Sequence, residues 1–283
     1  MKIGAVIPAR STSQRLPGKQ LADLGGRPVI VRMIERLASS RFLSPHRVVV
    51  CTTEESTDGE LAEVARSVGA SVFRGDSDDL IRRLADAVAE HGFDIVVEAD
   101  GDDPFVDVGY IDRGIELLRD HPDVDVALAP DLPLGLAAKV VRGSAFERVR
   151  ASYRTTSNDT GFMYFFTRTG LCTVERLPAE RAEHMRPDIR LTLDYDEDLA
   201  LMRTVFNRLD GASRIFGVDE IVTLFEQSPE LVAVNSHLNE EYWDRTDDLV
   251  ELEYERDGRT YVLRASDSSP SPSGVQPGED PAG

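Results

Sequence analysis

Cysteine, lysine and long apolar runs are all scarce in this chain of 283 residues. Its two cysteines, Cys51 and Cys172, exclude a disulfide framework and a Cys-rich metal site. Such cysteine usage is typical of a reducing compartment, so we expect a cytoplasmic protein. The apolar run at residues 3–7 ends at Pro8, too early for a secretory signal peptide. No apolar stretch approaches the roughly 20 residues of a membrane span, so no membrane association is expected.

Positive charge is also in short supply. The chain has 32 Lys and Arg residues against 51 Asp and Glu residues, for a formal net charge of -19. This balance argues against a nucleic-acid partner, which needs a basic surface, and against docking on anionic lipid. A small anionic substrate needs only one local basic cluster. Lysine occurs only at Lys2, Lys19 and Lys139, so each internal lysine is a candidate for a specific role.

Short β-branched runs alternate with helical patterns through the first half of the chain. We expect buried strands at residues 3–9, 47–52, 70–73, 94–97 and 124–128, and helices at residues 28–37, 59–68, 78–90 and 110–119. This alternation predicts an α/β fold with a Rossmann-like, mostly parallel sheet. Ligands of such sheets bind at the carboxyl ends of the strands.

After residue 130 the alternation weakens, which indicates a smaller inserted lobe at about 131–190 within a domain of residues 1–250. In this part of the chain we expect strands at 162–166 and 190–193, then helices at 196–209 and 218–226. Residues 251–265 alternate around Asp257-Gly258, which predicts a β-hairpin. Residues 266–283 are rich in Ser, Pro and Gly and are expected to be disordered.

Cations and hydroxyls crowd the loop that follows the first strand, Ala9-Arg10-Ser11-Thr12-Ser13-Gln14-Arg15-Leu16-Pro17-Gly18-Lys19. A polyphosphate needs such cations together with exposed backbone N–H groups. The loop is neither a Walker A motif nor a G-x-G-x-x-G dinucleotide motif. Its charge alone is equally compatible with a solvated loop. The rarity of lysine in the chain favours a phosphate site that includes Lys19.

Two further loops are acidic where predicted strands end. Glu98, Asp100, Asp102, Asp103 and Asp107 follow the strand at 94–97 and repel one another unless a cation intervenes. Mg²⁺ usually takes one or two carboxylates, with substrate phosphates and water completing its shell. Asp194 follows the predicted strand at 190–193, so we expect it to share a cation with Asp102. The nearby Asp196, Glu197 and Asp198 are expected to cap the following helix.

At these residues the sequence resembles a known family. The loop from Arg10 to Lys19 resembles the signature of cytidylyltransferases that activate acidic sugars, namely 3-deoxy-manno-octulosonate and sialic acid. The second half of the sequence is similar to relatives of the spore-coat polysaccharide type. Those relatives have a Gly-Asp-x-Pro turn, which is Gly101-Asp102-Asp103-Pro104 here. They also have an R-L-T-x-D strand followed by E-D-L, matched by Arg190 to Asp194 and by Glu197-Asp198-Leu199. The ordered set covers residues 2–209.

The resemblance implies a nucleotidyltransferase-type sheet and a role for each motif. An acceptor oxygen attacks the α-phosphorus of CTP and pyrophosphate leaves, with Mg²⁺ and cations balancing the developing charge. Catalytic roles fall to Arg10, Arg15, Lys19 and Asp102. Asp102 and Asp194 hold Mg²⁺. The nucleotide-binding residues are Pro8, Ala9, Arg10, Ser11, Ser13, Arg15, Lys19, Thr52, Thr53, Arg83 and Asp100. Relatives are often dimers through the inserted lobe, so a homodimer is expected.

The chain departs from the spore-coat pattern in one segment of this lobe. Those relatives have G-x-D-x-E after a proline, but here Ala137 and Lys139 replace the two acids. We therefore expect Lys139 to bind an acceptor more anionic than a neutral sugar phosphate. An acidic sugar or a small phosphonate such as phosphonoformate fits, since some phosphonate pathways use cytidylyltransferases of this sort. A surface lysine is the alternative at this position.

Two other functions remain open from the sequence. One is a nucleotidyltransferase that uses another nucleoside triphosphate on a sugar phosphate, and the other is a catalytically silent nucleotide-binding module. Among single residues, His184 is expected to be a solvated histidine at a helix end rather than a base, and Cys51 a core residue. Tyr242 and Trp243 are expected to pack against the C-terminal helices. The arginines considered for the acceptor lobe are Arg74, Arg142, Arg154 and Arg168.

Overall fold

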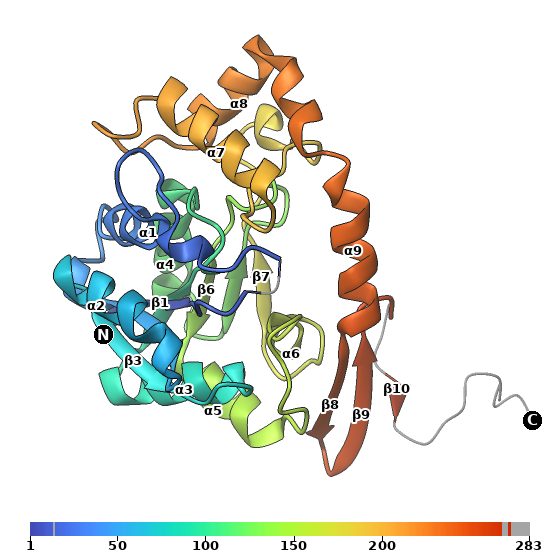
Figure 1. Ribbon diagram of the computed structural model, residues 1–283. Helices are drawn as coiled ribbons and strands as arrows, with labels where there is room; N and C mark the ends of the chain where they lie inside the picture. Colours follow the sequence, from blue (N-terminus) through green and yellow to red (C-terminus); the bar gives the residue numbers. More distant parts are fainter. Residues whose placement is uncertain (14, 268–270, 273–283) are drawn as a thin grey trace, which may run out of the picture.

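A computed structural model describes residues 1–13, 15–267 and 271–272, and its centre is a seven-stranded sheet (Figure 1). In spatial order the strands are β3 (Ser71–Gly75), β2 (Val48–Thr53), β1 (Ile3–Pro8), β4 (Ile95–Glu98), β6 (Lys139–Arg142), β5 (Val126–Leu128) and β7 (Val174–Arg176). The first four run parallel, whereas β6 is antiparallel to both of its neighbours. The prediction of a mostly parallel α/β sheet is therefore confirmed.

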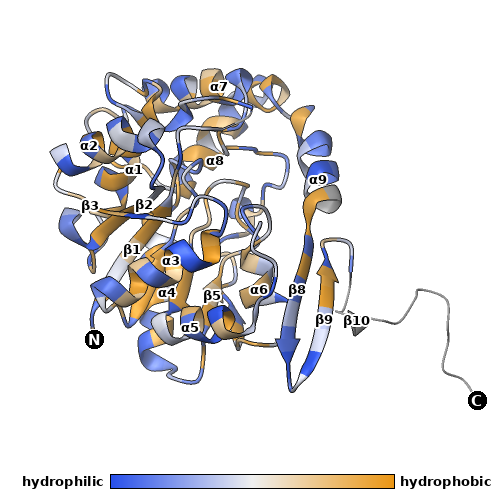
Figure 2. Ribbon diagram, turned by 60° about the horizontal axis from the view of Figure 1, so that its bottom comes forward, coloured by the Kyte–Doolittle hydropathy of each residue, from blue (hydrophilic) through white to orange (hydrophobic). Residues whose placement is uncertain are grey.

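Helices cover both faces of the sheet. The helices of the described residues are α1 (Val29–Leu37), α2 (Gly59–Ser67), α3 (Leu80–His91), α4 (Val108–Asp120), α5 (Gly143–Ser152), α6 (Met163–Thr167), α7 (Asp196–Arg208), α8 (Val218–Gln227) and α9 (Leu238–Leu249), of which α9 lies apart from the sheet. In β2, Val48 and Val50 pack into one core with α1 and α4, while Val49 and Cys51 pack into the other with α3 and α5. Both faces of the central strands β1, β2 and β4 are thus buried, which explains their continuous apolar runs (Figure 2).

The C-terminal part leaves the sheet. Figure 1 shows α9 leading from the end where α7 and α8 lie to a separate hairpin, β8 (Glu251–Arg256) and β9 (Arg259–Arg264). Asp257 and Gly258 both have positive φ, as the expected tight turn requires. Of the tail expected to be disordered, Ser271–Pro272 forms β10 and pairs with β9. Residues 268–270 and 273–283 lie outside the described part.

Two predicted strands were wrong. Residues 162–166 form most of a short helix, α6, because Phe162, Phe165 and Phe166 lie on one helical face and pack into the core beside α5. A short apolar run cannot be assigned by periodicity alone. Residues 190–193 form no strand of a sheet: Arg190 makes only an isolated bridge with Leu134, Leu191 donates its N–H to Leu134 O, and Leu193 donates to Asp102 O. They join two loops instead.

The segment expected to form an inserted lobe is partly integrated into the main sheet. It supplies β6 and β7, and α5 packs against α3. The division of the chain into a core, this lobe and a hairpin stays a prediction. No helix in the described residues has both the length and the apolar character needed to cross a membrane.

Candidate active site

The cation-rich loop after β1 closes on itself and is tied to β2. Gly18, at φ 70°, donates its N–H to the carbonyl of Ser11 at 3.0 Å, a left-handed position that suits a residue without Cβ. Asp58 accepts the Ser11 N–H at 2.7 Å and the Thr52 hydroxyl at 2.8 Å. The Thr53 hydroxyl also donates to Asp58. Thr52 and Thr53 therefore hold the loop in place through Asp58.

Lys19 connects the three polar loops. Its Nζ donates to Asp102 Oδ2 at 2.9 Å, to Asp194 Oδ1 at 3.0 Å and to the carbonyl of Leu193 at 2.8 Å. Burial opposes the charge on each group, but the pairing outweighs it. The pKa of Lys19 is accordingly raised and the pKa of Asp102 is lowered. The two carboxylates predicted to share a metal ion thus meet at one ammonium group.

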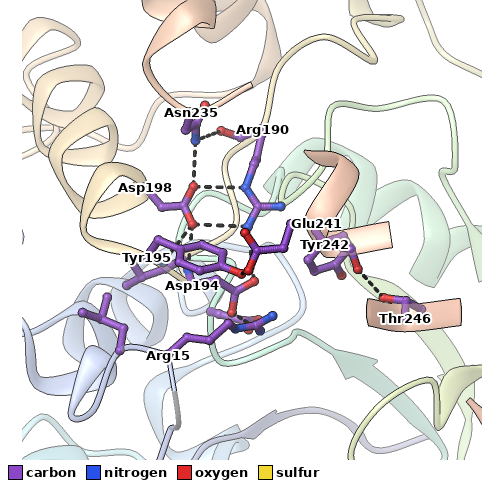
Figure 3. Close-up of polar contacts among 12 residues, drawn as sticks. Arg15, Arg190, Asp194, Tyr195, Asp198, Asn235, Glu241, Tyr242 and Thr246 are labelled. Atoms are coloured by element: carbon purple, nitrogen blue, oxygen red, sulfur yellow. Dashed lines mark hydrogen bonds and ion pairs between the residues drawn. The ribbon is translucent and has the colours of Figure 1, made fainter. Parts of the chain in front are cut away.

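Asp194 is completely buried and has other cationic partners (Figure 3). Arg15 donates to its Oδ1, and Arg190 Nη2 lies 3.3 Å from its Oδ2. Arg190 Nε also donates to Asp198 Oδ1 at 3.0 Å, and Asn235 donates to that oxygen at 2.8 Å. Arg15, Lys19 and Arg190 together balance the charge of Asp194 inside the protein and hold its side chain in one position.

The second loop approaches β1 closely at Gly101. A Cβ atom at this residue would lie 2.2 Å from the carbonyl oxygen of Pro8. The Gly-Asp-x-Pro turn therefore requires glycine for a steric reason. This close approach places Asp102 beside the cation-rich loop.

Two adjoining cavities open beside these loops. The smaller cavity, of about 240 Å³, extends from the cation-rich loop to Leu80 and Arg83 of α3. The larger cavity, of about 420 Å³, lies between the acidic loop, residues 129–139, residues 159–164 and α9. Both are lined by Arg15, Asp100, Asp102, Asp159, Thr160, Phe162 and Arg245. The two cavities are thus halves of one site, with Asp102 at their junction.

The smaller cavity suits a polyanion. Arg10, Arg15, Lys19 and Arg83 all line it. Arg10 forms an ion pair with Asp159, which lines the same cavity. Burial lowers the pKa of Arg83, and its Nε has no hydrogen-bond partner among the described residues. Such a buried, incompletely paired guanidinium favours an anionic ligand.

A family model for cytidylyltransferases matches residues 5–211. The chain belongs to the cytidylyltransferase family. It is accordingly a CTP-dependent nucleotidyltransferase, and therefore an enzyme. Residues 212–283, which include α8, α9 and the hairpin, lie beyond the matched range.

Individual relatives agree with this family assignment. A 3-deoxy-manno-octulosonate cytidylyltransferase of Francisella philomiragia is 40% identical over 132 residues, which cover 45% of this chain and 50% of that enzyme. A spore coat polysaccharide biosynthesis protein of Bacillus subtilis is 27% identical over 231 residues, covering 80% of this chain and 94% of that protein. The solved structure of a cytidylyltransferase from Leptospira borgpetersenii superposes with a TM-score of 0.74 at 28% identity, covering 82% and 97% of the two chains. These matches also support the nucleotidyltransferase type of the sheet.

In this cytidylyltransferase the structure brings most of the predicted residues to the smaller cavity. Its lining includes Pro8, Ala9, Arg10, Ser13, Arg15, Lys19, Arg83, Asp100 and Asp102. Of the other predicted residues, Ser11, Thr52, Thr53 and Asp194 are placed behind that lining rather than in it. Ser11 and the two threonines contact Asp58, so their position supports the loop.

The residues present fit Mg²⁺ as a partial ligand set. In residues 1–13, 15–267 and 271–272, no three His, Cys, Asp or Glu side chains group into a site that could hold a metal alone. Mg²⁺ needs no such site, because substrate phosphates supply further ligands. Asp102 and Asp194 converge on one cation, the ammonium of Lys19. Of the two, Asp102 faces the cavities and has a 27% exposed side chain.

Lys139 lines the larger cavity but is already paired. Its ammonium contacts Asp100 and lies 3.3 Å from Glu98, and these acids outweigh its burial and raise its pKa well above the ordinary value. Burial, followed by repulsion from Asp100, raises the pKa of Glu98 to about 8. The lysine is therefore engaged by the buried Glu98 and the partly exposed Asp100, and a role in acceptor binding competes with that pairing.

Several expectations about single residues need correction. His184 is buried, with Tyr110 Oη and Asp219 Oδ1 each 2.9 Å from its ring nitrogens, so it is not solvated. The arginines considered for the acceptor lobe do not line either cavity, because each is bound elsewhere. Arg74 donates to Thr53 O, Arg142 to Val124 O, Arg154 to Glu255 and Arg168 to Ala265 O. Cys51 is a core residue as expected.

Sequence reasoning missed residues of two kinds. Arg190 lies inside the R-L-T-x-D motif, so the motif contains the signal for it. Asp58, Asp159 and Arg245 have no local signal, because each depends on a partner or cavity far away in the sequence. Tyr242 and Trp243 line the larger cavity, and the Tyr242 ring centre lies 4.9 Å from the Arg190 guanidinium. The expectation that they pack the C-terminal helices therefore missed their position in the wall of the larger cavity.

Proposed function

We propose that this enzyme transfers CMP from CTP to a small anionic acceptor, an acidic sugar or a small phosphonate such as phosphonoformate, with Mg²⁺ as cofactor. The observation that carries the proposal is the pair of adjoining cavities. The one lined by Arg10, Arg15, Lys19 and Arg83 suits a triphosphate, and the other can hold a second substrate beside it. The 3-deoxy-manno-octulosonate cytidylyltransferase relative, matched over half its length, supports the acidic-sugar class.

In the proposed reaction, an acceptor oxygen forms a bond to the α-phosphorus of CTP, and the bond from that phosphorus to the oxygen bridging the α- and β-phosphates breaks. Arg10, Arg15 and Lys19 bind the phosphates and offset the charge that develops on the leaving pyrophosphate. Mg²⁺, held by Asp102 and Asp194, would supply Lewis-acid stabilisation of the same charge. A phosphonate oxygen is already ionised and needs no general base. A sugar hydroxyl must lose its proton.

Pyrophosphate release tests this function. We would incubate the enzyme with each of the four ribonucleoside triphosphates, Mg²⁺ and a panel of sugar acids, phosphonates and sugar phosphates. Release with CTP and an anionic acceptor supports the proposal, and EDTA should abolish it until excess Mg²⁺ is restored. Release with another nucleotide on a sugar phosphate would support the rival transferase. Nucleotide binding without release under any condition would support the silent binding module.

A homodimer and a cytoplasmic location remain predictions. Sedimentation velocity of the purified chain tests the dimer, and fractionation of the source cells tests the location.

A further inference from the structure

The larger cavity has one wall that the family match does not include. Tyr242, Trp243, Arg245 and Thr246 of α9 line it, and all four lie beyond residue 211, where the match ends. Tyr242, Arg245 and Thr246 are three or four positions apart, so they share one face of the helix. A segment outside the family's common core thus contributes side chains to the second half of the site.

Side-chain contacts hold α9 against the site (Figure 3). The Tyr242 ring centre lies 4.9 Å from the guanidinium carbon of Arg190, which itself binds Asp194. One residue earlier, Glu241 Oε1 accepts the Tyr195 hydroxyl at 2.7 Å. These two contacts attach α9 to the segment that carries Asp194, the predicted metal ligand. They therefore fix the position of Arg245 relative to the active site.

Arg245 differs from the other cations around the cavities in having no partner among the side chains that the structure describes. Lys19 pairs with Asp102, Arg15 with Asp194, and Lys139 with Asp100. Within the part of the chain whose side chains are described, Arg245 forms no hydrogen bond and no ion pair, although it lines both cavities. A guanidinium offers a planar fork that binds a carboxylate or phosphonate through two parallel hydrogen bonds.

We propose that Arg245 binds the anionic group of the acceptor, with Tyr242 and Trp243 as the aromatic wall beside it, so that α9 determines acceptor specificity. This inference rests on the proposed function and names a residue that sets its second substrate. It also reassigns the main acceptor contact from Lys139, which is paired with Asp100 and Glu98, to a cation with no ion-pair partner among the described side chains.

Steady-state kinetics separate this role from others. We would compare Arg245→Gln and Arg245→Lys with a control, Arg259→Gln, an exposed arginine of the neighbouring hairpin. With 3-deoxy-manno-octulosonate and phosphonoformate as probes, Arg245→Gln should raise the acceptor KM about tenfold to a hundredfold. The KM for CTP should stay within about twofold, and Arg245→Lys should recover part of the loss. An unchanged acceptor KM overturns the inference, and so does a parallel rise in the KM for CTP, which would assign Arg245 to the triphosphate.

A binding measurement keeps this test independent of turnover. Trp243 is the only tryptophan of the chain and lines the same cavity. Titration with either probe should change its fluorescence saturably in the wild type and in Arg259→Gln, and should require much higher concentrations in Arg245→Gln. Turnover without an effect of Arg245 leaves the proposed function standing and removes the inference. If the probes bind saturably and this binding depends on Arg245 but no turnover occurs, the inference stands and the proposed function fails. If neither probe binds saturably, the inference is overturned.

Discussion

Removal of the Arg190 guanidinium should destabilise the protein strongly, because among the described residues it is the only cation paired with the buried Asp198, and it also pairs with the buried Asp194. Arg190, Asp194 and Asp198 all have fully buried side chains. Arg190 donates to Asp198 at 3.0 and 3.2 Å and to Asp194 at 3.3 Å. We choose Arg190→Met, since methionine fills much of the same volume without charge. Loss of one partner from a buried ion pair costs about 3–5 kcal/mol, mainly because the carboxylates left behind remain desolvated.

The expected shift in melting temperature follows from the size of the chain. An unfolding entropy of about 2.1 cal/mol/K per residue makes 1 kcal/mol equivalent to about 1.7 °C for a chain of this length. Arg190→Met should therefore lower Tm by about 5–8 °C in differential scanning calorimetry. The matched control is Arg264→Gln, which breaks an exposed pair with Glu251 and should shift Tm by less than about 2 °C.

A double variant identifies the cause. If the uncompensated carboxylates carry the cost, adding Asp198→Asn to Arg190→Met should restore part of the lost stability, so the two changes should not be additive. A Tm for Arg190→Met within about 2 °C of the wild type would refute the reasoning. Strict additivity of the two changes would refute the electrostatic cause and leave only lost packing.

Other predictions test single parts of the site. Asp102→Asn should reduce turnover about a hundredfold or more while CTP still binds, measured by pyrophosphate release and calorimetric titration; unimpaired turnover would remove its metal role. Because Lys139 is paired with Glu98 and Asp100, Lys139→Ala should raise the acceptor KM less than Arg245→Gln does, with the KM for CTP unchanged; an equal or larger rise would return the main acceptor contact to Lys139. Gly101→Ala should lower stability by about 1–3 kcal/mol in urea unfolding and also reduce turnover, because its Cβ would lie 2.2 Å from the Pro8 carbonyl oxygen. The control is Gly59→Ala, whose Cβ would meet no atom within 4 Å and which should leave both properties unchanged. Cys51 is fully buried and Cys172 partly exposed, so a thiol reagent should label only Cys172 in the native enzyme; rapid labelling of both thiols would contradict the packing of β2.

The local sequence predicted those features that neighbouring residues control. Buried β-branched runs predicted β1, β2 and β4, because a strand with both faces covered needs continuous apolar residues. Gly18 and Gly101 marked the two loops at the strand ends, where a positive φ and a close backbone approach exclude a side chain. The carboxyl ends of parallel strands meet at one edge, so the grouping of the polar loops also followed from the order of the elements.

By itself, then, the sequence determined the sheet, its connecting helices and the cation-rich and acidic loops that belong to a cytidylyltransferase. The tertiary structure alone decided which charges pair, since Lys19 meets Asp102 and Asp194 across 83 and 175 positions of the chain. It also decided that residues 163–167 form a helix and that α9 lines the larger cavity. The physical reason is the same in each case: ion pairs, aromatic contacts and cavity walls depend on distances between segments that are remote in sequence, whereas hydrophobic periodicity and turn residues act within a few positions.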